Sequence, residues 1–152
     1  MKKITVSILA LSISTLSMAY KPPVGESKSI LVEVQATKDE IFKASKRALA
    51  LEGYQITSSD LDAGVITTAS NDYRIDPSYA DCGKVMGIDY LKDKRTKTRV
   101  AQNIIDDNSL SIKSNIQGEY KVGSTTFDVT LTCLSKVLIE ADLAEKIKSN
   151  LK

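Results

Sequence analysis

Two cysteines, Cys82 and Cys133, carry the most distinctive chemistry in this sequence. A thiol pair can act as a redox catalyst, but such catalysts hold their cysteines in a Cys-x-x-Cys motif at a helix N-terminus. These two cysteines are far apart and belong to no such motif. An even cysteine count in an exported chain favours pairing, and residues 1–19 have the pattern of an export signal. We therefore expect a structural disulfide between Cys82 and Cys133.

No histidine occurs anywhere in the chain, which removes the commonest general base near neutral pH and the commonest zinc ligand. Ser-His and Cys-His mechanisms are therefore excluded. The sequence also has no glycine-rich phosphate loop of standard spacing. Asp60 and Asp62 lack further acidic ligands at the spacing of a calcium loop, so we interpret them as turn residues. We expect no catalytic residue, no metal site and no cofactor.

The irregular segment from Asn71 to about Lys92 is the best candidate for a binding surface. Proline and glycine residues interrupt any periodic pattern along it. Its aromatic residues are Tyr73, Tyr79 and Tyr90. A stretch this long without clear structure is usually functional or disordered, and a disulfide at Cys82 would keep it ordered. The alternative is that the segment serves only structural packing.

A basic segment follows directly, and it contains Lys92, Lys94, Arg95, Lys97 and Arg99. Alternate residues of a strand share a face, so Arg95, Lys97 and Arg99 are expected to present three charges to one side. Such a face would suit an anionic component of the cell envelope. The alternative is a solvated edge strand whose charges prevent aggregation.

Residues 1–19 predict export with cleavage near Ala19. A basic start is followed by an apolar stretch and then by small residues, and the apolar run is too short to span a bilayer. Tyr20, and not a cysteine, stands directly after Ala19, so we expect a periplasmic or secreted chain that is not lipid-anchored. Without the two lysines of the leader, 19 basic and 19 acidic residues remain. That balance disfavours a nucleic-acid partner.

After the leader, periodicity predicts a flexible tether at 20–29 and a single α+β domain at 30–152. Strands are expected at 30–34, 54–58, 65–69, 96–105, 110–120 and 127–133. The first helix begins at a capping box formed by Thr37 and Glu40 and ends at Gly53. The second helix covers about 137–151, with Ser135 as its N-cap. The expected fold is an antiparallel sheet of about six strands with two helices on one face, in the order β-α-β5-α.

Several short patterns resemble those of small bacterial envelope proteins, often lipoproteins, of unassigned function. They are Ala48-Leu49-x-x-Glu52-Gly53-Tyr54, Ile56, Asp60, Gly64 to Thr68, Asp81-Cys82-Gly83, Asp93-x-Arg95, and Cys133-x-Ser135 with Glu140. The first half is also similar to the helix-grip domains of the C-subunit lipoprotein of the outer-membrane β-barrel assembly machinery. The resemblance implies a helix-grip-like sheet and a bridge between Cys82 and Cys133. Two departures are the missing lipid-bearing cysteine and Val137, which stands where relatives prefer glycine near the last helix.

These observations together predict a non-catalytic exported protein that acts as a binding module for another envelope protein. The first alternative is a secreted inhibitor or immunity-type protein that blocks a partner enzyme with the segment from Tyr73 to Tyr90. The second alternative is a cell-wall hydrolase that uses two carboxylates, because glycoside hydrolysis needs only two suitably spaced acids.

Overall fold

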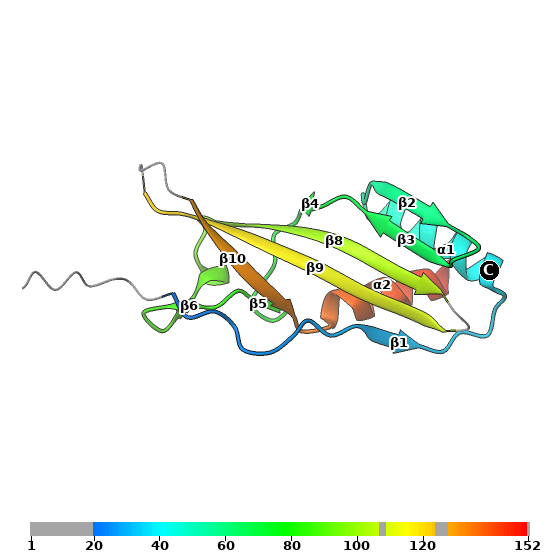
Figure 1. Ribbon diagram of the computed structural model, residues 1–152, viewed down its shortest axis with the longest axis horizontal. Helices are drawn as coiled ribbons and strands as arrows, with labels where there is room; N and C mark the ends of the chain where they lie inside the picture. Colours follow the sequence, from blue (N-terminus) through cyan, green and yellow to red (C-terminus); the bar gives the residue numbers. More distant parts are fainter. Residues whose placement is uncertain (1–19, 107–108, 124–127, 152) are drawn as a thin grey trace, which may run out of the picture.

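The computed structural model describes residues 20–106, 109–123 and 128–151, so the predicted export signal at 1–19 lies outside the described residues. Its main sheet has eight strands, in the order β2-β3-β8-β9-β10-β5, with β1 beside β9 and β4 beside β8 (Figure 1). These strands are β1 (Ile30–Val32), β2 (Ile56–Asp60), β3 (Val65–Thr68), β4 (Asn71–Asp72), β5 (Ala80–Asp81), β8 (Thr96–Asp106), β9 (Leu110–Lys121) and β10 (Asp128–Ser135). All of their pairings are antiparallel.

The α+β class is confirmed, but the predicted sheet of about six strands is wrong. The two additional strands of the main sheet are β4 and β5, which have two residues each. A strand of two residues is too short to show the alternation from which strands are predicted. A separate two-stranded hairpin, β6 (Lys84–Val85) with β7 (Ile88–Asp89), and a short 3-10 helix, η1 (Tyr90–Lys92), also lie in the segment predicted to be irregular.

Helix α1 (Lys38–Leu51) begins at the predicted capping box, which is confirmed. The Thr37 hydroxyl accepts a hydrogen bond from the Glu40 amide at 3.4 Å, and the Glu40 carboxylate accepts one from the Thr37 amide at 2.9 Å. The bond from the Thr37 amide, together with one from the Thr37 hydroxyl at 2.7 Å, lowers the pKa of Glu40, because both stabilise its carboxylate. Gly53 has a φ of 78°, the left-handed conformation that glycine adopts at a helix end.

The long hairpin of β8 and β9 forms the centre of the sheet, and its alternate side chains build the core. Val100 and Ile104 of β8 and Ile112 of β9 are fully buried, as the period of two predicts. Helix α1 and helix α2 (Leu138–Ser149) pack against each other and against β8 and β9. In the described ranges, neither helix has the length and hydropathy needed to cross a bilayer.

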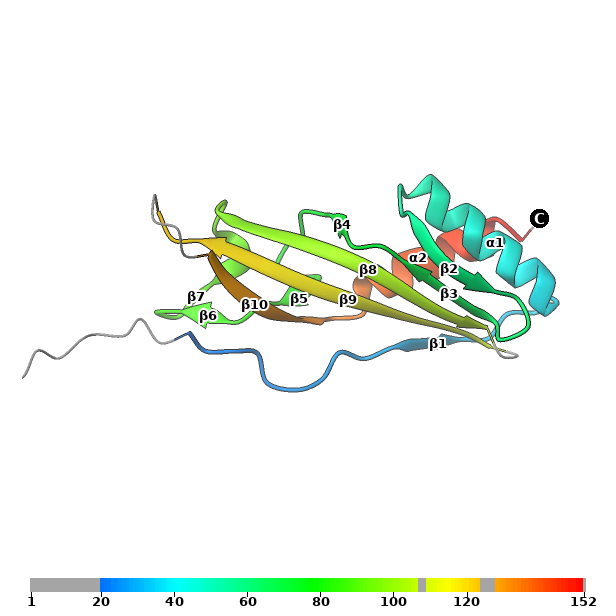
Figure 2. The same ribbon diagram turned by 45° about the horizontal axis from the view of Figure 1, so that its top comes forward.

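The helix arrangement differs from the prediction of two helices laid over one face in the order β-α-β5-α. In the described residues, nine strands and η1 lie between α1 and α2. Both helices gather at one end of the elongated sheet, and the segment that contains β5, β6, β7 and η1 lies toward the other end (Figures 1 and 2). The sheet was predicted from periodicity, which does not report how far along its strands a helix lies.

The start of α2 is strained and differs from the predicted N-cap at Ser135. Val137 occupies the N-cap position with a φ of 64° and makes no side-chain capping bond. The Ser135 hydroxyl instead accepts a hydrogen bond from the Val137 amide at 3.1 Å. A positive φ is a genuine outlier for a β-branched residue, so this is the conformation for which glycine is suited.

We expect Val137→Gly to raise the free energy of unfolding by about 1 kcal/mol, because a left-handed conformation costs roughly 1–2 kcal/mol in a residue with a Cβ. Leu138→Gly, at the first residue of α2, is the control and should lower it by about 1 kcal/mol. Urea unfolding of the two variants measures both changes. A Val137→Gly variant no more stable than Leu138→Gly would contradict this explanation of the strain.

Residues 20–29, predicted as a tether, contact the domain at several points. The Lys21 amide donates to the Lys84 carbonyl and the Lys84 amide to the Lys21 carbonyl, each at 3.0 Å. The Ser135 amide donates to the Ser27 hydroxyl at 3.4 Å. Gly83 is required here, because a Cβ at that position would overlap the Lys21 carbonyl. Residues 20–29 are therefore hydrogen-bonded to β6 through Lys21 and to the end of β10 through Ser27.

Candidate binding surface

The segment from Tyr73 to Arg95 is folded onto the sheet, and the predicted disulfide joins it to β10. Cys82 and Cys133 are bonded, with their Cα atoms 4.0 Å apart, and both residues are buried. Gly118 of β9 leaves room for the bridge, since a Cβ there would lie 3.2 Å from the Cys133 Sγ. The Lys136 amide also donates to the Tyr79 carbonyl at 2.9 Å. The segment is therefore held against β10 and against the turn before α2.

Tyr90, predicted as a binding residue, is a core residue. Only 5% of it is exposed, and its ring packs edge-on against Tyr20 and Tyr120 at centroid distances of 5.7 and 4.9 Å. Such pairs stabilise a fold beyond the area they bury. Tyr90 therefore contributes to the core, and its ring is not available at the surface for a partner. The sequence could not distinguish a buried tyrosine from an exposed one in a segment without periodicity.

The three predicted basic residues do not form one free patch. Arg95 lies before β8, where its guanidinium contacts the Asp93 carboxylate at 2.6 Å and stacks over Tyr120 at 4.9 Å. The guanidinium holds the pKa of Asp93 well below its usual range, because it stabilises the carboxylate. Arg99 is paired with Asp72 at 3.1 Å. Arg95 and Arg99 are therefore already partnered within the fold.

Lys97 and Arg99 lie on the exposed face of β8, the face opposite the helices. On the side away from β9, β3 pairs with β8 only at 103–105 and β4 only at Arg99 and Val100, so the alternative interpretation of a solvated edge stays a prediction for Lys97. Among the described residues, no ion pair involves Lys97. Lys97 is therefore the one member of the predicted basic triad whose charge has no such partner in the described ranges.

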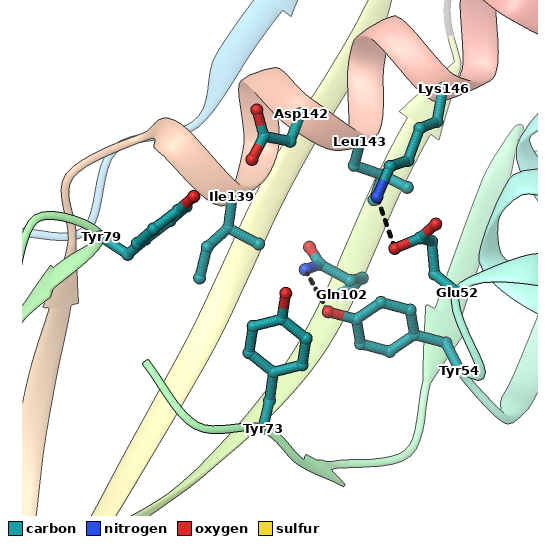
Figure 3. Close-up of a pocket in the computed structure, with 9 residues that line it drawn as sticks. All are labelled: Glu52, Tyr54, Tyr73, Tyr79, Gln102, Ile139, Asp142, Leu143 and Lys146. Carbon is teal, nitrogen blue, oxygen red and sulfur yellow. Dashed lines mark hydrogen bonds and ion pairs between the residues drawn. The ribbon is translucent and has the colours of Figure 1, made fainter. Parts of the chain in front are cut away.

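Tyr73 and Tyr79 contribute to a small pocket beneath α2 (Figure 3). Its lining is completed by Glu52, Tyr54, Gln102, Ile139, Asp142, Leu143 and Lys146. At its mouth, Lys146 and Glu52 form an ion pair at 2.5 Å, and this contact raises the pKa of Lys146. Burial raises the pKa of Tyr54, so its hydroxyl stays protonated.

The pocket is too small for a metabolite. Its volume is about 30 Å³, which matches a single water molecule, whereas small-ligand sites occupy about 300–1,000 Å³. Within the described ranges, no group of three or more Cys, Asp and Glu residues is placed to hold a metal ion. The pocket can therefore order a water molecule but offers no room for a substrate.

A chain of buried polar side chains leads from this pocket into the interior. The Gln102 amide group donates to the Tyr54 hydroxyl at 3.2 Å and accepts from the Ser114 hydroxyl at 2.9 Å. The fully buried carboxylate of Glu140 accepts from the Ser114 amide at 3.1 Å and from the Ser135 hydroxyl at 2.7 Å. Ser114 lies where β9 passes from β1 to β10. Neither β1 nor β10 pairs with β9 at Ser114, so the Glu140 carboxylate supplies the hydrogen-bond acceptor for the Ser114 amide.

The most exposed apolar side chain of the segment is at the tip of the β6–β7 hairpin, in a stretch that was predicted to be irregular. Met86 and Gly87 form its two-residue turn, with φ values of 51° and 81°. Two positive φ values are typical of a type I′ turn, in which Asn-Gly is the favoured pair. Met86 is 80% exposed and Ile88 is 61% exposed. The branched residues on either side of Met86-Gly87 were the signal that could have indicated this hairpin.

The hairpin projects at the end of the molecule opposite the two helices (Figure 1). Its base is fixed on both sides, by the backbone pairing of Lys84 with Lys21 and by the disulfide at Cys82. The Tyr90 amide donates to the Gly83 carbonyl at 3.2 Å, and the Asp89 carboxylate accepts from the Leu91 amide at 2.9 Å. The exposed tip therefore stands on a rigid base.

In comparisons with known proteins, no family model matches the chain, and no curated protein is detectably similar to it.

Proposed function

We propose that this protein is a non-catalytic binding module whose β6–β7 hairpin inserts Met86 and Ile88 into an apolar pocket of another protein of the cell envelope. The observation that carries the proposal is the residue type at Met86. This position favours asparagine or glycine on conformational grounds, and solvent exposure favours a polar side chain. A strained and exposed methionine satisfies neither preference, and such outliers cluster at functional sites.

The base of the hairpin supports the same proposal. A tip that is already ordered loses little conformational entropy on binding, so more of the contact energy appears as affinity. Methionine is also polarizable and adapts to the shape of an apolar pocket. Full burial of a methionine side chain contributes about 1.5–3 kcal/mol. A single such anchor is too weak to hold the protein on a lipid surface, but it is the size of a protein hot spot.

The disulfide is compatible with export, because disulfides persist in oxidising compartments. We propose that the mature chain is periplasmic or secreted and is not lipid-anchored. Its partner is then another protein of the same compartment.

Met86→Asn separates binding from folding. Asparagine is favoured at this turn position, so we expect the free energy of unfolding to stay equal or rise, while the dissociation constant for the partner rises by about thirtyfold or more. The partner is first identified by cross-linking the tagged protein in its native envelope. Its affinity for the purified variants is then measured by calorimetry.

The control is Leu51→Asn at the end of α1. Leu51 is an exposed apolar residue like Met86, with 70% of its surface exposed, but it lies on a helix away from the hairpin. We expect it to bind the partner with unchanged affinity. Equal affinities for the wild type, Met86→Asn and Leu51→Asn would show that the hairpin tip is not the binding site.

The same rigid, disulfide-braced tip also suits the alternative of an inhibitor or immunity-type protein. In that case the captured partner is a hydrolase, and the tip occupies its active site. Tight one-to-one binding that abolishes the hydrolase activity, and that Met86→Asn reverses, distinguishes this alternative from a scaffold or adaptor function.

A further inference from the structure

A second surface feature, separate from the hairpin tip, is a cationic hollow between β4 and the start of β8. Its volume is about 310 Å³, and its charged lining residues are Arg74, Lys94, Lys97 and Asp72. The three cations are all exposed. The proposal below concerns this hollow alone and does not depend on the proposed function.

The three cations have no carboxylate partner of their own in the described ranges, where every ion pair involves other residues. Asp72 is the only acid of the lining, and it contacts Arg99 at 3.1 Å. Exposed cations elsewhere on the described chain include paired residues, such as Arg95, and residues without an ion pair, such as Lys28, but three cations line this one hollow together. Positive charge is therefore concentrated in a concave site on a chain with little net charge, and such a site focuses the field on an anion.

Backbone contacts fix the positions from which these side chains extend. The Tyr73 amide donates to the Thr98 carbonyl at 3.0 Å, and the Thr98 hydroxyl donates to the Tyr73 carbonyl. The Thr96 amide donates to the Asp93 carbonyl at 3.0 Å. The chain is therefore ordered on both sides of the hollow before any ligand binds.

The lining favours a phosphate group over a protein surface. Lysine is depleted in the cores of protein interfaces, whereas arginine and lysine together are typical of phosphate sites. The one aromatic residue of the hollow, Tyr73, points its hydroxyl toward Gln102 and Tyr54 in the pocket beneath α2 (Figure 3). A volume of about 310 Å³ lies at the lower limit of small-ligand sites.

We infer that the hollow formed by Arg74, Lys94 and Lys97 binds a phosphate group, carried either by a lipid headgroup or by a soluble phosphate. The test compares the triple variant Arg74→Gln/Lys94→Gln/Lys97→Gln with the control Lys28→Gln/Arg47→Gln/Lys113→Gln. Both remove three exposed positive charges, so they differ only in where the charge is removed.

Two probes distinguish the sources of the phosphate. Inorganic phosphate is titrated while backbone amide chemical shifts are followed, and phosphatidylglycerol vesicles are compared with phosphatidylcholine vesicles in a sedimentation assay. We expect shifts centred on the three residues, and at least about tenfold weaker phosphate binding in the triple variant than in the control. If the protein also binds phosphatidylglycerol vesicles, and phosphate competes with that binding, the source is a lipid headgroup. If the protein binds inorganic phosphate but does not bind the vesicles, the source is a soluble phosphate.

Three results would overturn the inference. The first is an equal loss of binding in the two triple variants, since net charge alone would then explain it. The second is the absence of both phosphate-dependent shifts and binding to anionic vesicles. The third is binding of a polyglutamate peptide that the triple variant abolishes but phosphate does not compete, since the ligand would then be an acidic protein segment.

Discussion

Reduction of the bridge between Cys82 and Cys133 is expected to lower the free energy of unfolding by about 4 kcal/mol, because the bridge closes a loop with a sequence separation of 51 residues. Reduction removes the chain-entropy constraint without removing a side chain from the buried site of the bridge. Urea unfolding with and without reductant measures the difference. The bridged segment also carries the hairpin, so partner affinity should fall together with stability.

The double variant Cys82→Ala/Cys133→Ala is the control for this experiment, since its stability cannot depend on the reductant. A change of less than about 1 kcal/mol on reducing the wild type would mean that other contacts already restrict this loop in the unfolded chain.

Glu140→Leu is expected to destabilise the protein by about 3 kcal/mol, because it leaves two buried donors without an acceptor and each costs about 1–3 kcal/mol. The donors are the Ser114 amide and the Ser135 hydroxyl. The leucine is similar in size to glutamate, so the lost hydrogen bonds, and not a cavity, dominate the change. Thermal unfolding followed by circular dichroism measures the effect.

Glu145→Leu on the same helix is the matched control. Glu145 is exposed, and its ion pair within the described residues is with Lys148 at 2.9 Å. Exposed pairs of this kind contribute about 0.3–0.5 kcal/mol. If the two variants were equally stable, the hydrogen bonds that the Glu140 carboxylate accepts from Ser114 and Ser135 would not be what stabilises this part of the fold.

Local chemistry made part of this fold predictable from the sequence. Thr37 and Glu40 specify a helix start through contacts that lie three residues apart. The alternation along β8 and β9 identified a sheet with one buried face. The cysteine pairing followed from their even number. The helix start and the strands depend on residues close together in the sequence. The disulfide depends only on there being two cysteines in the chain.

The surface of the irregular segment could not be predicted in the same way. Whether Tyr90 is buried depends on Tyr20 and Tyr120, which come from distant parts of the chain. Whether Arg99 is available depends on Asp72, which a neighbouring strand brings beside it. Met86 was overlooked because the usual hairpin signal is Asn-Gly, and this chain places methionine in that turn. Long-range partners, and not local propensity, decided which residues remained exposed.

The most direct test of the hairpin as the binding site uses Met86 itself, which is the only methionine in the described residues. The protein is expressed with a diazirine analogue of methionine, bound to its partner and irradiated, and the cross-linked peptides are identified by mass spectrometry. We predict a cross-link from the peptide that spans residues 85–92 to residues of an apolar pocket on the partner. A partner that stays bound but forms no cross-link to that peptide would contradict the proposed function.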